Sequence, residues 1–183
     1  MTEIVSEMRY TKKRVQVLGK SMAYVDTDPD QKTGSDTFVF FHGNITSSYM
    51  WRNIMPHVED KARCIAIDSI GQGDSEKLEN SGPDSYRLEE HQRYVNGLLT
   101  EIGLEGPVLL MMHDWGAQLG TTWARQTGAN IKGIAYTQGV MGNFGWDYWP
   151  PHVSDLMRRF KSDEGEELVL QQIFFVEKIL LLK

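Results

Sequence analysis

Hydrophobic residues along the chain gather in short, nearly continuous apolar runs: Thr37–Phe41, Arg63–Asp68, Pro107–Met112 and Ile131–Thr137. Such runs are typical of strands that are covered on both faces, as in a parallel sheet. Segments with helical spacing of apolar residues lie between them, at Tyr49–His57, Tyr86–Ile102 and Trp115–Thr127. This alternation of strand and helix predicts a doubly wound α/β domain with a mostly parallel sheet flanked by helices.

The two ends of the chain have a different pattern. Arg14–Val17 and Ser21–Asp26 alternate between apolar and polar residues, which predicts a hairpin of edge strands. Beyond Gly139, glycines and aromatic residues precede two helical segments, His152–Lys161 and Glu164–Leu182, and no strand pattern returns. We therefore expect residues 1–142 to form the sheet domain and residues 143–183 to begin a helical cap.

Composition and charge exclude several classes of protein. The chain is 40% hydrophobic and 24% charged, with a formal net charge of −6, which argues against nucleic-acid coating and against polybasic membrane binding. Cys64 is the single cysteine, so an intrachain disulfide and a multi-cysteine zinc site are excluded. No apolar run approaches the roughly 20 residues of a membrane span, and the polar N-terminus does not resemble a signal peptide. We expect a soluble, cytoplasmic protein.

Candidate chemistry lies after two of the predicted strands. His113-Asp114-Trp115-Gly116 places a carboxylate between a strand and a helix, which is the arrangement of a nucleophile elbow with Asp as the nucleophile. Helix N-terminal N–H groups would stabilise its charge there. The alternative for Asp114 is an ordinary helix cap.

The second candidate is Asn44, which follows His42-Gly43 at the end of the first run. The Asn44 amide and the Trp115 indole N–H are hydrogen-bond donors that could hold an anion leaving a carbon opposite Asp114. The alternatives are a left-handed turn residue for Asn44 and a packed core aromatic for Trp115.

These motifs resemble those of the haloalkane dehalogenases, which have the α/β-hydrolase fold. The resemblance runs in register from about Arg14 to Leu180, and the segments that carry it are His42–His57, Arg63–Ser75, His113–Gly116 and Gly165–Glu177. Coelenterazine luciferases of the sea-pansy type belong to the same branch, and Ser85–Leu88 and Lys161–Gly165 are similar to them.

The resemblance implies a two-step hydrolysis of a small apolar haloalkane by water, with no cofactor and no metal. Asp114 would displace the halide and form an alkyl ester, while Asn44 and Trp115 would bind the halide. A water activated by a histidine, itself oriented by an acid, would then hydrolyse the ester to an alcohol. The cap aromatics Trp146, Trp149, Phe174 and Phe175 would either line the substrate pocket or pack the cap.

Two departures from the family bear on turnover. The position of the family's acid is Gln138, whose neutral amide can orient an imidazole but cannot stabilise its cation. The family's catalytic histidine lies beyond the cap, and none of the five histidines of this chain matches it: His42, His57, His91, His113 and His152. Since the chain ends at Lys183, inside the expected cap, we expect impaired turnover, together with self-association or a complementing chain that covers the apolar end.

Three other functions remain open. A luciferase-like monooxygenase would use the same pocket for coelenterazine. An epoxide hydrolase also has Asp on such an elbow, but Asn44-Ile45 here lacks the proline of its first motif. A catalytically inactive hydrolase-fold module would bind without turnover.

Overall fold

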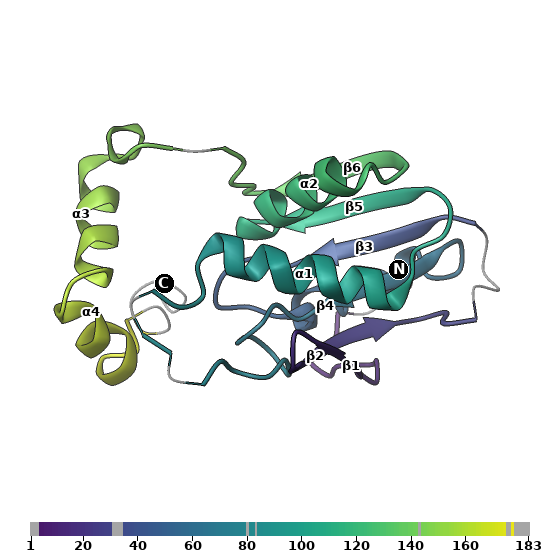
Figure 1. Cartoon of the computed structure of the whole chain (residues 1–183), viewed down its shortest axis with the longest axis horizontal. Coiled ribbons are helices and arrows are strands. Elements are labelled where there is room, and N and C mark those ends of the chain that lie inside the picture. The colour runs from purple at the N-terminus through teal and green to yellow at the C-terminus, as the bar shows by residue number, and fades with distance from the viewer. Residues whose placement is uncertain are drawn as a thin grey trace. The chain divides into compact units, whose positions relative to one another are not determined.

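The computed structural model of the chain describes residues 4–30, 35–79, 81–82, 84–142, 144–174 and 177. They fall into two compact units, Met1–Met141 and Gly142–Lys183. The first unit is a sheet with helices packed on it, and the second is helical (Figure 1).

In the described part of the first unit, six strands form one mixed sheet in the order β1-β2-β4-β3-β5-β6. The central pairs β4·β3, β3·β5 and β5·β6 are parallel, whereas β1·β2 and β2·β4 are antiparallel. The strands are β1 (Lys13–Val17), β2 (Lys20–Asp26), β3 (Thr37–Phe41), β4 (Arg63–Ile67), β5 (Val108–His113) and β6 (Ile131–Thr137). The four apolar runs are therefore the parallel strands, as predicted, and their carboxyl ends meet at one edge of the sheet.

Two long helices cover one face of this sheet. α1 (Leu88–Ile102) and α2 (Trp115–Thr127) lie side by side over it (Figure 1). Their apolar residues Leu98 and Trp123 join Phe41 and Leu110 of the strands in one buried cluster. Burial of these side chains is the main force that holds the helices against the sheet.

The other face is covered by two short 3-10 helices, η1 (Ser48–Trp51) and η2 (Met55–His57), whose Trp51 and Met55 pack with Phe40. The prediction of one helix over Tyr49–His57 is therefore wrong. The backbone bonds here join residues three apart, and Pro56 has no N–H with which to continue an α-helical ladder.

Two expectations about the sheet need correction. β2 is not an edge strand, because it pairs with β4 as well as with β1. β6 is not covered on both faces: five of its seven residues are exposed, among them the large apolar Ile134 and Tyr136. β6 pairs only with β5 among the described residues, so its outer edge is open.

The second unit contains short helical elements: η3 (Trp146–Tyr148), α3 (Pro151–Phe160), α4 (Glu164–Glu166) and η4 (Glu167–Gln171). α3 matches its prediction, whereas the continuous helix expected over Glu164–Leu182 is wrong within the described residues, since it is interrupted at Gln172 and Ile173; residues 175, 176 and 178–182 lie outside the described residues. The backbone widens to a π turn after Glu166, and Gln172 N–H bonds to Glu167, five residues back. Among the residues that the structure describes, none of the helices has the length and hydropathy of a membrane-spanning segment.

Candidate active site

Asp114 is the single residue between β5 and α2. Its backbone has φ 51° and ψ −126°, a conformation that is strained for any residue with a side chain. Two N–H groups, of Ala117 and Val140, bond to its carbonyl oxygen at 3.0 and 3.1 Å and hold this turn. Its carboxylate makes no capping hydrogen bond to α2 within the described residues, so Asp114 does not serve as an ordinary helix cap.

The carboxylate of Asp114 meets the end of the neighbouring strand β3. The backbone N–H of Asn44 donates to Asp114 Oδ1 at 3.0 Å. Gly43 makes this approach possible, because a Cβ there would overlap the Asp114 side chain. Gly116 does the same for the helix, since a Cβ on it would lie 2.6 Å from the carbonyl oxygen of His42. Asn44 and Asp114 are thus in contact, and the contact is made by the backbone N–H of Asn44 rather than by its side-chain amide.

The side chains of Asn44 and Trp115 are both exposed. Gln72 Nε2 donates to Asn44 Oδ1 at 3.4 Å, which orients the amide with its oxygen toward Gln72 and leaves its NH₂ group as a donor. Trp115 opens α2 and is 36% exposed, so it is not a packed core residue. The exposure of Trp115 excludes a packed core aromatic. Asn44 is not the left-handed residue of this turn either, because that conformation is adopted by Ile45, with φ 51°.

His42 is buried beneath the Asn44 turn. Its Nε2 accepts from Ser69 N–H at 3.0 Å, and its Nδ1 lies 2.7 Å from the carbonyl oxygen of Gly43. Burial lowers the pKa of His42 below its ordinary value, so the ring is neutral near pH 7. In the sequence, the only indication that His42 contacts this turn is its position two residues before Asn44.

Asp68, the residue after β4, is a second buried group that sequence reasoning missed. It accepts from Ser48 N–H at 2.7 Å, Asp74 N–H at 2.8 Å and Lys12 Nζ at 2.6 Å. Burial alone would raise the pKa of Asp68, but these hydrogen bonds hold it below its ordinary value. Its charge anchors the loop that supplies Ser69.

Gln138 follows β6 and lies at the same edge of the sheet. Its Oε1 lies 3.0 Å from His113 Nε2, and its backbone has φ 50°. The Thr137 carbonyl accepts from Asp114 N–H at 3.3 Å, which ties this strand end to the elbow. His113 is thus the imidazole that Gln138 meets in this chain.

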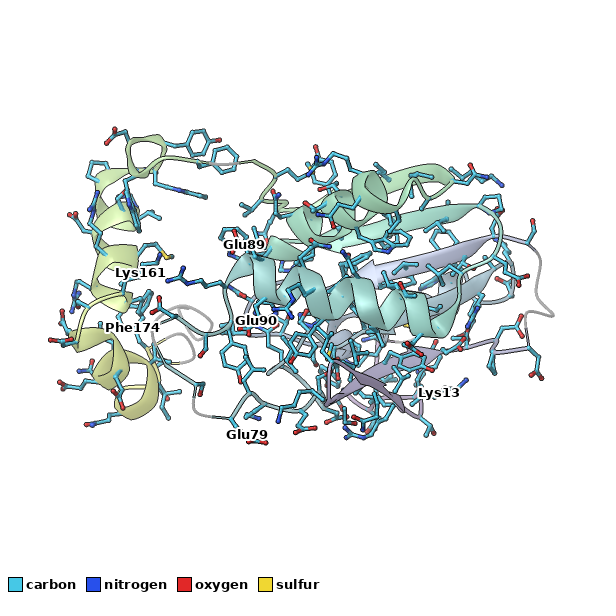
Figure 2. The ribbon with its side chains drawn as sticks, viewed as in Figure 1. Lys13, Glu79, Glu89, Glu90, Lys161 and Phe174 are labelled. Atoms are coloured by element: carbon cyan, nitrogen blue, oxygen red, sulfur yellow. The ribbon has the colours of Figure 1, made fainter. Side chains whose placement is uncertain are left out.

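The cap aromatics belong to the second unit, where they contact other aromatic rings. Trp149 packs edge-on against Tyr148 with ring centroids 5.4 Å apart, and Phe174 packs against Phe160 at 5.6 Å. Phe174 is labelled in Figure 2. Trp146 is exposed beneath the guanidinium of Arg158. Phe175 lies outside the described residues.

The described residues contain no group of three or more His, Cys, Asp or Glu side chains placed to hold a metal ion.

Comparison with known proteins adds family relationships to this geometry. A family model for the α/β hydrolase fold matches residues 36–173. A haloalkane dehalogenase of Sphingobium indicum is 46% identical over 169 residues, 92% of this chain and 55% of that protein. Coelenterazine h 2-monooxygenase of Renilla reniformis is 38% identical over 169 residues, 92% of this chain and 52% of that protein.

The solved structures agree in fold. The crystal structure of DBJA matches with a TM-score of 0.81 and 31% identity, over 94% of this chain and 58% of that chain. The chain thus spans about half the length of the relatives that it matches.

Proposed function

Since the chain belongs to the α/β-hydrolase fold family, we propose that Asp114 is the nucleophile of a haloalkane-dehalogenase-like hydrolase. The observation that carries this proposal is the strained turn of Asp114, between strand and helix, with Asn44 N–H bonded to its carboxylate. A nucleophile elbow exposes its side chain in this way at the carboxyl edge of a parallel sheet.

The first step is a displacement at carbon. A carboxylate oxygen of Asp114 forms a C–O bond to the substrate as the C–X bond breaks, and the halide leaves with the bonding electron pair. The Asn44 NH₂ group and the Trp115 indole N–H are the donors that we assign to the leaving halide. Because both side chains are exposed beside the elbow, they can turn toward an incoming substrate.

The second step is hydrolysis of the alkyl ester by an activated water. We place Gln138 at the position of the acid that orients the base. Its amide oxygen is within hydrogen-bond distance of His113, but it carries no charge to stabilise an imidazolium. We therefore propose that displacement proceeds in this chain and that hydrolysis is impaired.

The test is incubation of the chain with 1-bromobutane or 1-iodobutane, followed by intact-mass and peptide mass spectrometry. One butyl group on Asp114 and halide release of at most one equivalent are expected, and the Asp114→Asn variant remains unmodified. Halide release over many equivalents would contradict impaired hydrolysis. No adduct in the folded protein would contradict Asp114 as the nucleophile.

A second candidate function is a luciferase-like monooxygenase, which the similarity to the coelenterazine h 2-monooxygenase of Renilla reniformis favours. Light emission on addition of coelenterazine in air, and its loss without oxygen, distinguishes this candidate from a hydrolase. A catalytically inactive binding module would give neither light nor an adduct.

We further assign residues 143–183 to the start of a cap and Trp146, Trp149 and Phe174 to an apolar substrate pocket. Support comes from the compact second unit and from its aromatic side chains. The outer edge of β6 has no partner strand in the described part of the chain, which supports pairing with a strand from a second copy or a complementing chain. The single, buried, free Cys64 is compatible with a cytoplasmic location.

A further inference from the structure

The peptide group between Gly43 and Asn44 is held at both of its ends. Its N–H, on Asn44, donates to Asp114 Oδ1 at 3.0 Å. Its carbonyl oxygen, on Gly43, lies 2.7 Å from His42 Nδ1 and accepts from Thr46 Oγ1 at 3.0 Å. Because a peptide group is planar, groups that fix the direction of the C=O also fix the direction of the N–H.

Ser69 decides which nitrogen of His42 carries the proton. A backbone N–H can only donate, so His42 Nε2, 3.0 Å from Ser69 N, must accept. The proton of the neutral ring is then on Nδ1, and Nδ1–H donates to the Gly43 carbonyl. The ring is buried, which prevents it from exchanging these partners for water.

These contacts form one continuous chain of hydrogen bonds from Ser69 through His42 and the Gly43–Asn44 peptide to Asp114. Each bond in such a chain polarises the next, and a donor to a carbonyl makes the N–H of the same peptide group a stronger donor. Ser69 itself is adjacent to Asp68, whose carboxylate is fixed by Ser48 N–H and Lys12. The Ser69 end of this hydrogen-bond chain is therefore rigid.

We infer that His42, assisted by Thr46, is a positioning residue that directs and polarises Asn44 N–H toward the carboxylate of Asp114. The effect of this positioning on the reaction rate rests on the proposed function, in which Asp114 is the nucleophile. The positioning itself does not. A carboxylate held in one orientation reacts faster than one that rotates, because the attacking oxygen is already in place.

Two pairs of variants separate this role from packing. His42→Asn retains an N–H donor at the position of Nδ1, whereas His42→Gln places its polar atoms near Nε2 and loses that donor. Thr46→Ser retains the hydroxyl, whereas Thr46→Val removes it with little change in volume. Thr46 is only half-buried, so its pair remains informative if either His42 variant fails to fold.

The first readout is the chemical shift of the Asn44 amide proton in the folded, ¹⁵N-labelled chain. The shift should move upfield in His42→Gln and Thr46→Val, and stay near the wild-type value in His42→Asn and Thr46→Ser. The second readout is the rate of Asp114 alkylation by 1-iodobutane. It should fall about tenfold in His42→Gln, less in Thr46→Val, and little in the two conservative variants.

Equal shifts within each pair would overturn the inference, because they would mean that only side-chain volume matters. The amide shift does not depend on alkylation. A wild-type chain that is not alkylated but shows the expected shifts would therefore support the inference while contradicting the proposed nucleophile. Normal alkylation with unchanged Asn44 shifts in all variants would do the reverse.

Discussion

The side chain of Asp114 occupies the space that a side chain on Gly43 would need, at the edge of the sheet. A Cβ on Gly43 would overlap the Cβ and Oδ1 of Asp114. The overlap falls on a residue whose own backbone is strained, so Asp114 has little freedom to yield. Gly43→Ala should therefore displace the carboxylate and slow its alkylation by about 100-fold, since a shift of about 1 Å suffices for such a loss.

Gly82→Ala is the matched control, because a Cβ at that position meets nothing within 4 Å in the described structure. Its alkylation rate, followed by mass spectrometry over time, should equal that of the wild type. An unaltered rate in Gly43→Ala would mean that the carboxylate does not need its place against β3.

The buried carboxylate of Asp68 should make the free energy of unfolding depend on pH in the acid range. Its pKa is lower in the folded chain than in the unfolded chain, so its stabilising contribution is present in full above about pH 4. This contribution is lost as the pH falls through the lowered folded-state pKa. Asp68→Asn should reduce the free energy of unfolding by about 3 kcal/mol at pH 7, and the difference from the wild type should shrink below about pH 4.

Urea unfolding at several pH values measures this difference. Asp74→Asn removes the other carboxylate that contacts Lys12, but its side chain is 53% exposed. We expect that variant to lose less than about 1 kcal/mol at pH 7. A difference between wild type and Asp68→Asn that stays constant down to pH 2 would contradict the assignment.

Asp26 has two cationic partners of unequal burial. Arg63 donates twice to its carboxylate, at 3.0 Å each, and both side chains are buried. Lys13, labelled in Figure 2, lies 3.4 Å away and is about a third exposed. Arg63→Met should cost about 3–5 kcal/mol because it leaves a buried charge without its main partner. Lys13→Met should cost less than about 1 kcal/mol. Equal losses, measured by urea unfolding, would contradict this ranking.

The exposed apolar residues of β6 predict self-association of the chain. Ile134 is exposed on the strand whose outer edge is unpaired in the described sheet. Ile134→Lys should shift the chain toward monomer in sedimentation velocity at a fixed concentration. Ile54→Lys places the same charge on an exposed isoleucine away from this edge and should not. A wild-type chain that is monomeric at high concentration would exclude association through β6.

The local pattern of apolar and polar residues was enough to predict those strands and helices whose whole length favours one type of secondary structure. β3, β6 and α2 have the predicted bounds, because an apolar run or helical spacing there is interrupted by nothing that prevents pairing or helix formation. The helix expected from Tyr86 begins at Leu88, since Tyr86 has φ 57° and lies outside the helical region.

The contacts of the candidate site depend on strand order and were harder to foresee. The sequence assigned the side-chain amide of Asn44 to the leaving halide, and the separate contact of its backbone N–H with Asp114 was not foreseen, because no residue type encodes a backbone contact. Arg63 and Asp26 meet only because β2 pairs with β4, a non-adjacent strand in sequence. The role of Asp68 likewise depends on Lys12 and Ser48, which approach it from different segments.

The central position of β3 also sets the order in which the protein can fold during synthesis. β4 follows β3 closely along the chain, but β5, its other neighbour, is made much later. Asn44 and Asp114 are 70 residues apart, which at about 5–20 residues per second corresponds to roughly 4–14 s of translation. Throughout that interval the nascent chain carries an apolar strand with one open edge. This open edge is where the nascent chain can pair wrongly or aggregate before β5 has been synthesised.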